Sequence, residues 1–522
     1  IDHPGDGAVK NGMLDIGIYD DPDNQIQASA LIDIDNKNTL IIGASQYGKT
    51  NLLQSVIKSI GLTRSPSEAV FYILDFGSMV LKNFEMLNNV GGVVTSSEDE
   101  KLKNLFKLLF EEINFRKEKL VSVGVSSFSS YVDAGYKDMP HIYLVVDNLT
   151  ALSELYLEDD DSLLMIIRDG ISVGISTIVA NSQTAGIGYK YISNFANKVV
   201  LYCNDSGEYS NVFDHVTVKP DEKPGRCIVE IDKRLFECQS YLAFAGDREI
   251  DRVNKIKAFV EQSNAKHKEK RARMIPCIPN VLTAAILQTD FAAKATGFSI
   301  PIGLTYSDVK PFGFNLSQMG VWGISGKEGS GHKNIIKYIV NQLNLKRKQK
   351  AEIVVFDDVS RKYAFLKNKV TDYFIGTENV AEVIRRWHKE LEKRYDALLL
   401  DESTAQNDLL LMIVQNNDVA AAIQKDTELS DMYSEITGRF RDFGVCIIFA
   451  NYPNSAISYD APDAIRAVKQ DRHLLYLDDL ANLKSFDVPY EALREYKKPL
   501  STGDGYYIND NDVTKLKLVF AD

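Results

Sequence analysis

Short apolar runs and helical apolar stripes alternate along the first half of the chain. Residues 39–42 read as a buried strand, and apolar positions 52, 53, 56, 57 and 60 share one face of the helix that follows. Further strand-length runs occur at 70–75, 140–147, 174–181, 198–203 and 226–231, with helical stripes at 101–120 and 163–169. The alternation predicts an α/β domain whose mostly parallel sheet is flanked by helices.

The second half repeats this pattern in the same order. Segments 15–18, 43–50, 72–75, 112–116 and 174–181 have counterparts at 299–304, 326–333, 353–357, 390–394 and 444–451. Between the halves, a charged helical stretch leads into the proline-rich strap 275–279. We therefore predict two tandem P-loop modules: residues 1–255, a linker with strap at 256–282, and a degenerate second module at 283–522.

Composition excludes several classes of protein. The chain has 522 residues, 45% apolar and 25% charged, which is typical of a packed multidomain protein. The five cysteines are scattered without a CxxC pair, which favours a reducing cytosolic compartment over a disulfide framework or zinc site. A net charge of −12 disfavours nucleic acid, and the basic clusters 266–273 and 346–350 lack aromatic residues for base stacking.

Residues 43–50 form a glycine-rich loop of the kind that binds phosphate groups. It matches the G-x-x-x-x-G-K-[ST] spacing after a strand and before a helix, and it consists of Gly43, Ala44, Ser45, Gln46, Tyr47, Gly48, Lys49 and Thr50. Glycines let backbone N–H groups converge on phosphates, the Lys49 ammonium reaches the β- and γ-phosphates, and the Thr50 hydroxyl ligates Mg²⁺. The loop therefore predicts ATP and Mg²⁺ as cofactors.

Such a loop also needs an acidic residue at the end of a second buried strand. Asp147 supplies it, and we expect Asp147 with Thr50 to hold Mg²⁺; by itself, it would be read as a turn cap. Asn148 follows where an active ATPase commonly has a glutamate base, so binding is better supported than hydrolysis. Glu154 is a substitute base or part of a solvated helix face. Asn181 is a candidate γ-phosphate sensor or a turn cap.

The second copy keeps the glycine loop and loses the chemistry. His332 occupies the lysine position, Lys333 the Ser/Thr position, and Gln415 the position of the magnesium carboxylate. We expect weak or absent nucleotide binding there, although a shifted Lys333 could still reach a phosphate.

Taken together, these motifs resemble those of the FtsK/SpoIIIE-type ATPases, most closely the second and third modules of the type VII secretion ATPases EssC and EccC. The resemblance spans both copies and rests on residues 17–25, Glu112-x-x-x-Arg116, Pro140 before the Asp147 strand, residues 168–175, and the 275–279 strap. It implies RecA-like P-loop folds and a trans-acting arginine finger, for which Arg168, Arg439 and Arg441 are candidates by position.

The resemblance also implies a function. It points to the cytoplasmic part of a membrane-anchored, oligomeric secretion motor that works with membrane components and exports helical-hairpin substrates of the WXG100 class. Whether this part is an active enzyme stays open, and a DNA translocase fragment is the alternative. The second module would be regulatory or would receive a helical substrate tail that carries an aromatic residue and a carboxylate, with Lys327, His332 and Lys333 at the rim; otherwise it is a spacer.

Overall fold

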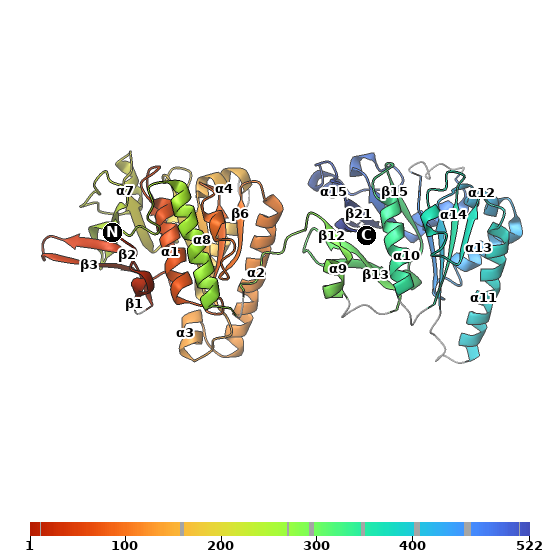
Figure 1. Cartoon of the computed structure of the whole chain (residues 1–522), viewed down its shortest axis with the longest axis horizontal. Coiled ribbons are helices and arrows are strands. Elements are labelled where there is room, and N and C mark those ends of the chain that lie inside the picture. Colours follow the sequence, from red (N-terminus) through yellow and green to blue (C-terminus); the bar gives the residue numbers. More distant parts are fainter. Residues whose placement is uncertain are drawn as a thin grey trace. The chain divides into compact units, whose positions relative to one another are not determined.

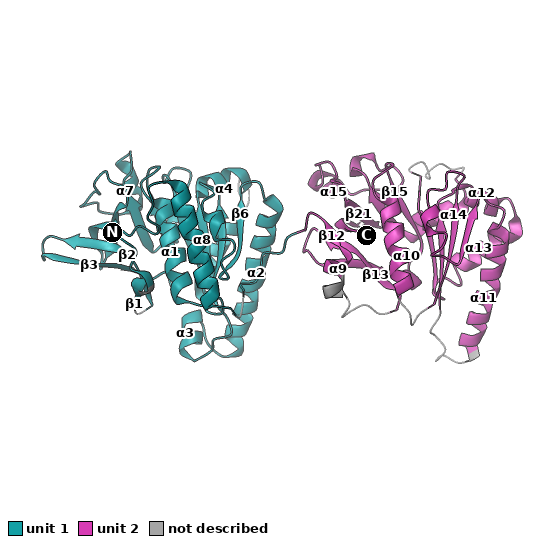
Figure 2. Ribbon diagram, viewed as in Figure 1, with its two compact units in different colours: residues 1–277 teal, residues 278–522 magenta. Residues whose placement is uncertain are grey.

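The computed structural model divides into two compact units, residues 1–277 and 278–522 (Figure 2). It describes residues 1–10, 12–156, 161–268, 271–291, 297–345, 350–400, 408–453, 461–510 and 512–521. The division falls inside the stretch expected as linker. Parts of both basic clusters, 269–270 and 346–349, lie outside the described residues.

Unit 1 is built around an eleven-stranded sheet with the order β1-β2-β11-β10-β9-β4-β8-β7-β5-β6, in which β3 also pairs with β2. The strands are β1 Val9–Lys10, β2 Met13–Asp21, β3 Ile26–Ile32, β4 Thr39–Ile42, β5 Ala69–Asp75, β6 Val90–Thr95, β7 His141–Asp147, β8 Ile175–Asn181, β9 Asn197–Leu201, β10 Arg226–Ile231 and β11 Arg234–Ser240. Strands β9, β4, β8, β7, β5 and β6 run parallel, whereas β10, β11 and β2 extend the sheet antiparallel. The parallel half confirms the predicted fold class.

Helices cover both faces of this sheet. They are α1 Lys49–Thr63, α2 Asp99–Ser122, α3 Phe128–Asp133, α4 Leu149–Tyr156, α5 Ser162–Gly170, α6 Tyr189–Ile192, α7 Gly207–Val212 and α8 Glu249–Lys266. Alternate residues of β5 point to opposite faces, so that Phe71 packs with α1 and α8, while Tyr72 packs with α2 and α5. Figure 1 shows α1 and α8 side by side on one face.

Unit 2 repeats the topology of unit 1 except at the first short strand, because β1 pairs antiparallel with β2 whereas β12 pairs parallel with β22. Its sheet has the order β14-β13-β22-β21-β20-β15-β19-β18-β16-β17, with β12 beside β22. The strands are β12 Leu282–Thr283, β13 Ser299–Thr305, β14 Pro311–Asn315, β15 Gly320–Gly326, β16 Ala351–Asp357, β17 Asp372–Ile375, β18 Leu409–Val414, β19 Val445–Phe449, β20 His473–Leu477, β21 Asp504–Asn509 and β22 Asp512–Phe520. Helices are α9 Ala284–Phe291, α10 His332–Leu345, α11 Val380–Leu400, α12 Asp418–Gln424, α13 Thr427–Thr437, α14 Asp463–Asp471 and α15 Tyr490–Glu495. The internal repeat predicted from the sequence is therefore confirmed. Among the described residues, no helix is both long and apolar enough to cross a membrane.

A buried arginine joins the long helix to the sheet in each unit. In unit 1 the fully buried Arg116 of α2 bonds Glu112 at 2.8 Å and donates to the carbonyls of Pro140 at 2.7 Å and Val173 at 3.0 Å, just before β7 and β8. Arg394 of α11 repeats this arrangement with Glu390 and with the carbonyls that precede β18 and β19. The Glu-x-x-x-Arg pattern is therefore a structural brace at the amino ends of two central strands.

We predict that Arg116→Met destabilises unit 1 by about 3–5 kcal/mol, because Glu112 and the strand-end carbonyls lose their buried partner. Urea unfolding followed by circular dichroism measures both units. Fluorescence of the two tryptophans, Trp322 and Trp387, measures unit 2 alone. In Arg116→Met, the part of the dichroism change that reports unit 1 should occur at lower urea. The midpoint of the fluorescence transition, which reports unit 2, should not change.

The neighbouring Lys117→Met is the matched control, since its side chain is 48% exposed and forms only a surface pair with Asp169. Equal midpoints for Arg116→Met and Lys117→Met would show that the brace contributes nothing.

Candidate functional site

The loop between β4 and α1 presents a set of free backbone donors. Gly48 precedes α1 in the left-handed region at φ 113, which glycine adopts without steric cost. A Cβ on Gly43 would lie 2.7 Å from the Cβ of Leu201, so strand β9 leaves no room for a side chain there. Within the part of the chain that the structure describes, the N–H groups of Ser45 to Thr50 have no protein acceptor. This cradle fits a phosphate chain.

Lys49 folds back over the loop that contains it. Its ammonium donates to the carbonyls of Gly43 at 2.8 Å and Ala44 at 2.9 Å. Burial lowers the pKa of Lys49, and the nearby Asp147 opposes that effect. The charge therefore stands at the mouth of the cradle, where an anionic ligand would replace carbonyl partners by phosphate oxygens.

Thr50 and Asp147 lie together as the sequence suggested. The Thr50 hydroxyl donates to the Asp147 carboxylate at 3.3 Å. Asp75 ends β5 directly beside Asp147 in the register of the sheet. Burial first, and the charge of Asp75 second, raise the pKa of Asp147 to about 6. Burial also raises the pKa of Asp75. Two buried carboxylates that disfavour each other's charge, next to a hydroxyl, are a donor set suited to Mg²⁺.

Asn148 sits in a strained conformation. Its φ of 72 lies in the left-handed region, which asparagine tolerates better than glutamate. Its side-chain oxygen accepts the N–H of Ala151 at 3.3 Å and so caps α4. The backbone at this position thus favours the residue that the sequence has over the expected glutamate base.

Asn181 and Arg168 are placed differently from each other. The backbone carbonyl of Asn181 accepts the N–H of Gly43 at 3.3 Å, which brings the end of β8 against the loop. The Asn181 side chain is 1% exposed and bonds both the N–H and the hydroxyl of Thr150, so it ties β8 to α4. Arg168 is exposed and pairs with Asp169 at 2.8 Å. It lies on α5, shortly before the amino end of β8, whereas the phosphate loop follows the carboxyl end of the parallel strand β4.

The remaining candidates belong to other elements of the two units. Glu154 is exposed on α4. Arg439 lies over the ring of Tyr395 at 4.2 Å, and Arg441 pairs with Asp471 at 2.8 Å. Only the loop, Asp147, Asn148 and the backbone of Asn181 converge within unit 1.

Unit 2 keeps the loop backbone without its chemistry. Gly329 and Gly331 have φ of 83 and 122, matching 70 and 113 at Gln46 and Gly48. Burial lowers the pKa of His332 to about 4, so its imidazole is neutral at pH 7. Its buried Nε2 has no partner among the described residues. The loop is therefore preserved as a backbone shape.

The carboxylate end of unit 2 is also neutralised. Gln415 takes the place of Asp147 and accepts the N–H of Asp358 at 3.2 Å. Asp357, the counterpart of Asp75, accepts the N–H of Tyr363 at 2.7 Å and the hydroxyl of Tyr373 at 2.6 Å. Protein donors satisfy Asp357, as the N–H groups of Met79 at 3.0 Å and Lys82 at 3.2 Å do for Asp75. The units differ in that Asp75 has a second carboxylate, Asp147, beside it in the sheet, whereas Asp357 has Gln415.

Sequence reasoning missed Asp75. The signal was present, because 70–75 is an apolar run closed by an aspartate, as is 140–147. What the spacing could not give was the adjacency of β5 and β7, which places the two carboxylates side by side.

Known proteins share the sequence pattern and the fold of this chain. Residues 18–216 match the model of the FtsK/SpoIIIE family. The ESX secretion system protein EccC of Geobacillus thermodenitrificans is 23% identical over 526 residues, which cover 99% of this chain and 35% of that protein. The chain thus spans about a third of the length of the curated relatives it matches.

Two solved structures share the fold of the whole chain. EssC ATPases 2 and 3 of Geobacillus thermodenitrificans superpose with a TM-score of 0.87 at 21% identity, covering 100% of this chain and 99% of that one. EccC ATPases 2 and 3 of Thermomonospora curvata, solved in complex with a signal sequence peptide, give a TM-score of 0.63 at 20% identity, covering 98% and 93%. The resemblance drawn from the sequence is confirmed.

The carboxylate pair predicts a pH-dependent stability. Raising the pKa of Asp147 from 3.8 to about 6 costs its ionised form about 3 kcal/mol. That cost is absent below pH 3.8 and complete above about pH 6, so the free energy of unfolding falls as the pH rises through this window. We expect Asp147→Asn, without Mg²⁺ or nucleotide, to stabilise unit 1 by up to about 3 kcal/mol at pH 7.5 and to lose this advantage toward pH 4.

Asp357→Asn is the matched control in unit 2 and should destabilise, because that carboxylate accepts three protein hydrogen bonds. Urea midpoints at several pH values measure both effects. A destabilised Asp147→Asn at pH 7.5 would contradict the assigned cost.

Proposed function

Because this chain is a tandem of FtsK/SpoIIIE-type ATPase modules similar to ATPases 2 and 3 of EssC and EccC, we propose that it is the cytoplasmic ATPase segment of a membrane-anchored type VII secretion motor. Its first module binds Mg-ATP and hydrolyses it slowly. Its second module binds no nucleotide and recognises the exported protein. The full-length protein supplies the membrane anchor and the further modules with which it oligomerises.

One observation carries the asymmetry between the modules. The same loop backbone holds Lys49, Thr50 and a buried Asp147 in unit 1, and a neutral His332, an exposed Lys333 and Gln415 in unit 2. In unit 1 the loop N–H groups and Lys49 would bind the phosphates, and Thr50 with Asp147 would hold Mg²⁺, which supplies Lewis acidity at the terminal phosphate. Asn181, whose backbone touches the loop, would sense the phosphate state through its link to Thr150.

Slow hydrolysis follows from the lack of a base. Asn148 can orient a water but cannot take its proton, and general-base assistance is commonly worth about 10²–10⁴-fold. Arg168 lies outside its own module's site, so it would act only as a finger toward a neighbouring module.

The proposed recognition role rests on a groove that unit 1 fills by itself. Residues 272–276 cross between edge strand β6 and helix α2. The Ile275 N–H donates to Gly91 at 2.9 Å, and the Tyr72 hydroxyl donates to the Arg273 carbonyl at 2.9 Å. Ile275 is 3% exposed and belongs to the core. Arg273 pairs with Glu111 and Glu112 of α2, each at 3.7 Å. Unit 1 thus binds an extended peptide as part of its own chain.

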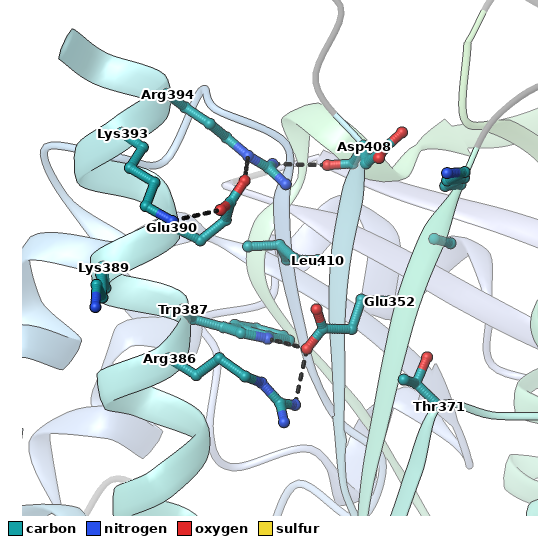
Figure 3. A pocket seen from close by; sticks show the side chains of 12 residues that line it. Glu352, Thr371, Arg386, Trp387, Lys389, Glu390, Lys393, Arg394, Asp408 and Leu410 are labelled. Atoms are coloured by element: carbon teal, nitrogen blue, oxygen red, sulfur yellow. Dashed lines mark hydrogen bonds and ion pairs between the residues drawn. The ribbon is translucent and has the colours of Figure 1, made fainter. Parts of the chain in front are cut away.

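Among the residues that the structure describes, none fills the equivalent groove of unit 2. A pocket of about 540 Å³ lies between α11 and the amino ends of β16 and β18 (Figure 3). Thr371 stands at its edge as Gly91 does in unit 1, and Glu390 and Arg394 of the brace line it. The described part of unit 2 therefore has a pocket where the strap lies in unit 1.

The charges of this groove indicate the ligand. Lys389 takes the place of Glu111, and Lys350 and Lys393 also line the pocket. The carboxylates of Glu352 and Glu390 are already paired with Arg386 at 2.8 Å and Arg394 at 3.2 Å (Figure 3). An extended peptide with acidic side chains fits here, where the strap offers an arginine in unit 1.

We assign this ligand to the tail of a secreted substrate of the WXG100 class, in line with the peptide bound to the Thermomonospora EccC modules. The groove supports this assignment better than the degenerate phosphate cleft does. There His332 is half-buried with its Nε2 atom inaccessible, and Lys327 faces Asp478 at 4.0 Å.

A DNA translocase is the second candidate, because the sequence resemblance to FtsK/SpoIIIE-type ATPases implies it as the alternative and residues 18–216 match that family's model. The net charge of −12 argues against it. Stimulation of ATP hydrolysis by duplex DNA that weakens steeply with salt would support the translocase instead.

We predict one nucleotide site, in unit 1. Lys49→Ala should weaken ATP binding at least tenfold through loss of the phosphate contact, and His332→Ala should leave it unchanged. Titration calorimetry of the whole chain with ATP and Mg²⁺ measures both, with stoichiometry near one. Equal losses in the two variants would refute the asymmetry.

The groove generates a charge-swap prediction. A peptide with the sequence of residues 271–279, but with glutamate at positions 271 and 273, should bind the chain more tightly than the unchanged peptide. Lys389→Glu with Lys393→Glu should reverse that preference by roughly tenfold in total, as two rim ion pairs allow. Fluorescence anisotropy of labelled peptides measures it.

Lys425→Glu with Lys497→Glu is the control, since both lysines are exposed and lie outside the pocket lining. The groove loses its role if the control changes binding as much as the groove variant, or if tails of WXG100 partners bind neither form.

A further inference from the structure

The order of the strands gives the bound nucleotide a direction. Strand β4, which leads into the phosphate loop, lies between β8 and β9. The metal-binding end, Thr50 with Asp147, is on the β8 and β7 side. A nucleotide with its terminal phosphate and Mg²⁺ at that end must project its nucleoside toward the other side, over the end of β9.

Two tyrosines stand at that other side. Tyr47 belongs to the phosphate loop and Tyr202 follows β9 directly. Their ring centroids are 4.6 Å apart, with 37° between the planes. The backbone fixes both, since the Ala44 N–H donates to the Tyr202 carbonyl at 2.8 Å and the Gly225 N–H donates to the Tyr47 carbonyl at 2.9 Å. Both side chains are only half-buried, so aromatic surface remains accessible beside the loop.

A third contact orients the pair. The Tyr47 hydroxyl donates to the exposed Glu222 carboxylate at 3.0 Å. The ring therefore has a fixed tilt without being enclosed in the core. A tyrosine pair that served packing alone would be buried, as Tyr143 is beside Phe71.

Unit 2 lacks this pair. Ser330, between Gly329 and Gly331, takes the place of Tyr47, and Asp478, directly after β20, takes the place of Tyr202. The rings are thus present only in the unit that keeps the lysine and the magnesium carboxylate. In the other unit an aspartate faces Lys327 at 4.0 Å.

We propose that Tyr47 and Tyr202 form the stacking platform for the nucleobase of the bound nucleotide, with Tyr202 as the residue that distinguishes a nucleotide from a bare polyphosphate. This rests on the proposed nucleotide site in unit 1. Every base has a π-face, so the platform favours nucleotides in general and prefers purines to pyrimidines only through their larger stacking surface.

Calorimetry of the whole chain with two probes, Mg-ATP and Mg-tripolyphosphate, tests the platform. Tyr202→Leu keeps apolar volume but removes the ring. It should weaken ATP binding about 5- to 150-fold, the equivalent of the ~1–3 kcal/mol of a base–aromatic stack, and leave tripolyphosphate binding unchanged. Tyr47→Phe keeps the ring and removes only the hydroxyl that contacts Glu222, so it should weaken ATP binding less than Tyr202→Leu does.

A spectroscopic readout separates stacking from a merely structural role. The fluorescence of 2-aminopurine riboside triphosphate should be quenched on binding to the parent chain and less so on Tyr202→Leu or Tyr47→Leu. Tyr189→Ala, at a tyrosine that is 84% exposed, is the control.

The two proposals fail in different ways. If Lys49→Ala abolishes binding of both probes while Tyr202→Leu and Tyr47→Leu bind ATP and quench 2-aminopurine as the parent does, the platform is wrong and the nucleotide site stands. If Tyr202→Leu weakens tripolyphosphate as much as ATP, the tyrosine only supports the loop and the platform is again wrong. If the parent chain binds neither probe, both proposals fall.

Discussion

The site depends on one backbone constraint, a glycine in the left-handed region directly before the helix that follows each glycine loop. These glycines are Gly48 before α1 and Gly331 before α10. At φ 113 and 122, Gly48 and Gly331 turn the chain in the same way; in unit 1 the N–H groups of Ser45 to Thr50 have no protein acceptor among the described residues, whereas in unit 2 the Ser330 N–H donates to the Lys327 carbonyl at 3.2 Å. An L side chain in this conformation would be strained, which keeps glycine there in both units. The loop shape is therefore independent of whether a lysine follows, and unit 2 can lose its chemistry without losing its frame.

The second constraint lies at the amino ends of the central strands, opposite the carboxyl ends that hold the loop. Arg116 and Arg394 gather the carbonyls that precede the two central strands of their units, so each long helix is fixed to the sheet by the same three contacts. That brace also forms one wall of the strap groove. The peptide groove and the stability of the sheet thus share residues, which explains how unit 2 keeps the groove's outline while its rim charges change from Glu111 to Lys389.

Local spacing made the phosphate loop, Asp147 and the repeat predictable from the sequence. Those features depend on residues close together in the chain or on patterns that recur in the same order. The features that escaped depend on strand adjacency, which spacing does not encode: Asp75 lies beside Asp147 only because β5 pairs with β7. In the same way, Arg168 is close in sequence to strand β8, whose carboxyl end meets the loop. Arg168 precedes the amino end of that strand, and the amino and carboxyl ends of parallel strands lie on opposite sides of the sheet. The strand at 226–231 was predicted, but the antiparallel pairing of β10, β11 and β2 was not, for the same reason.

The two modules also differ in what their buried carboxylates cost. In unit 1, Asp147 and Asp75 sit side by side with raised pKa values, so the empty site carries an electrostatic penalty that a cation relieves. In unit 2, Gln415 removes one charge, and Tyr363 with Tyr373 satisfies Asp357. A cation beside Asp147 and Asp75 would reduce the cost of bringing two buried negative charges together, whereas unit 2 has a single carboxylate at this position that protein donors already satisfy. The electrostatics of the two carboxyl ends therefore agree with the proposal that Mg²⁺ binds in unit 1 and not in unit 2.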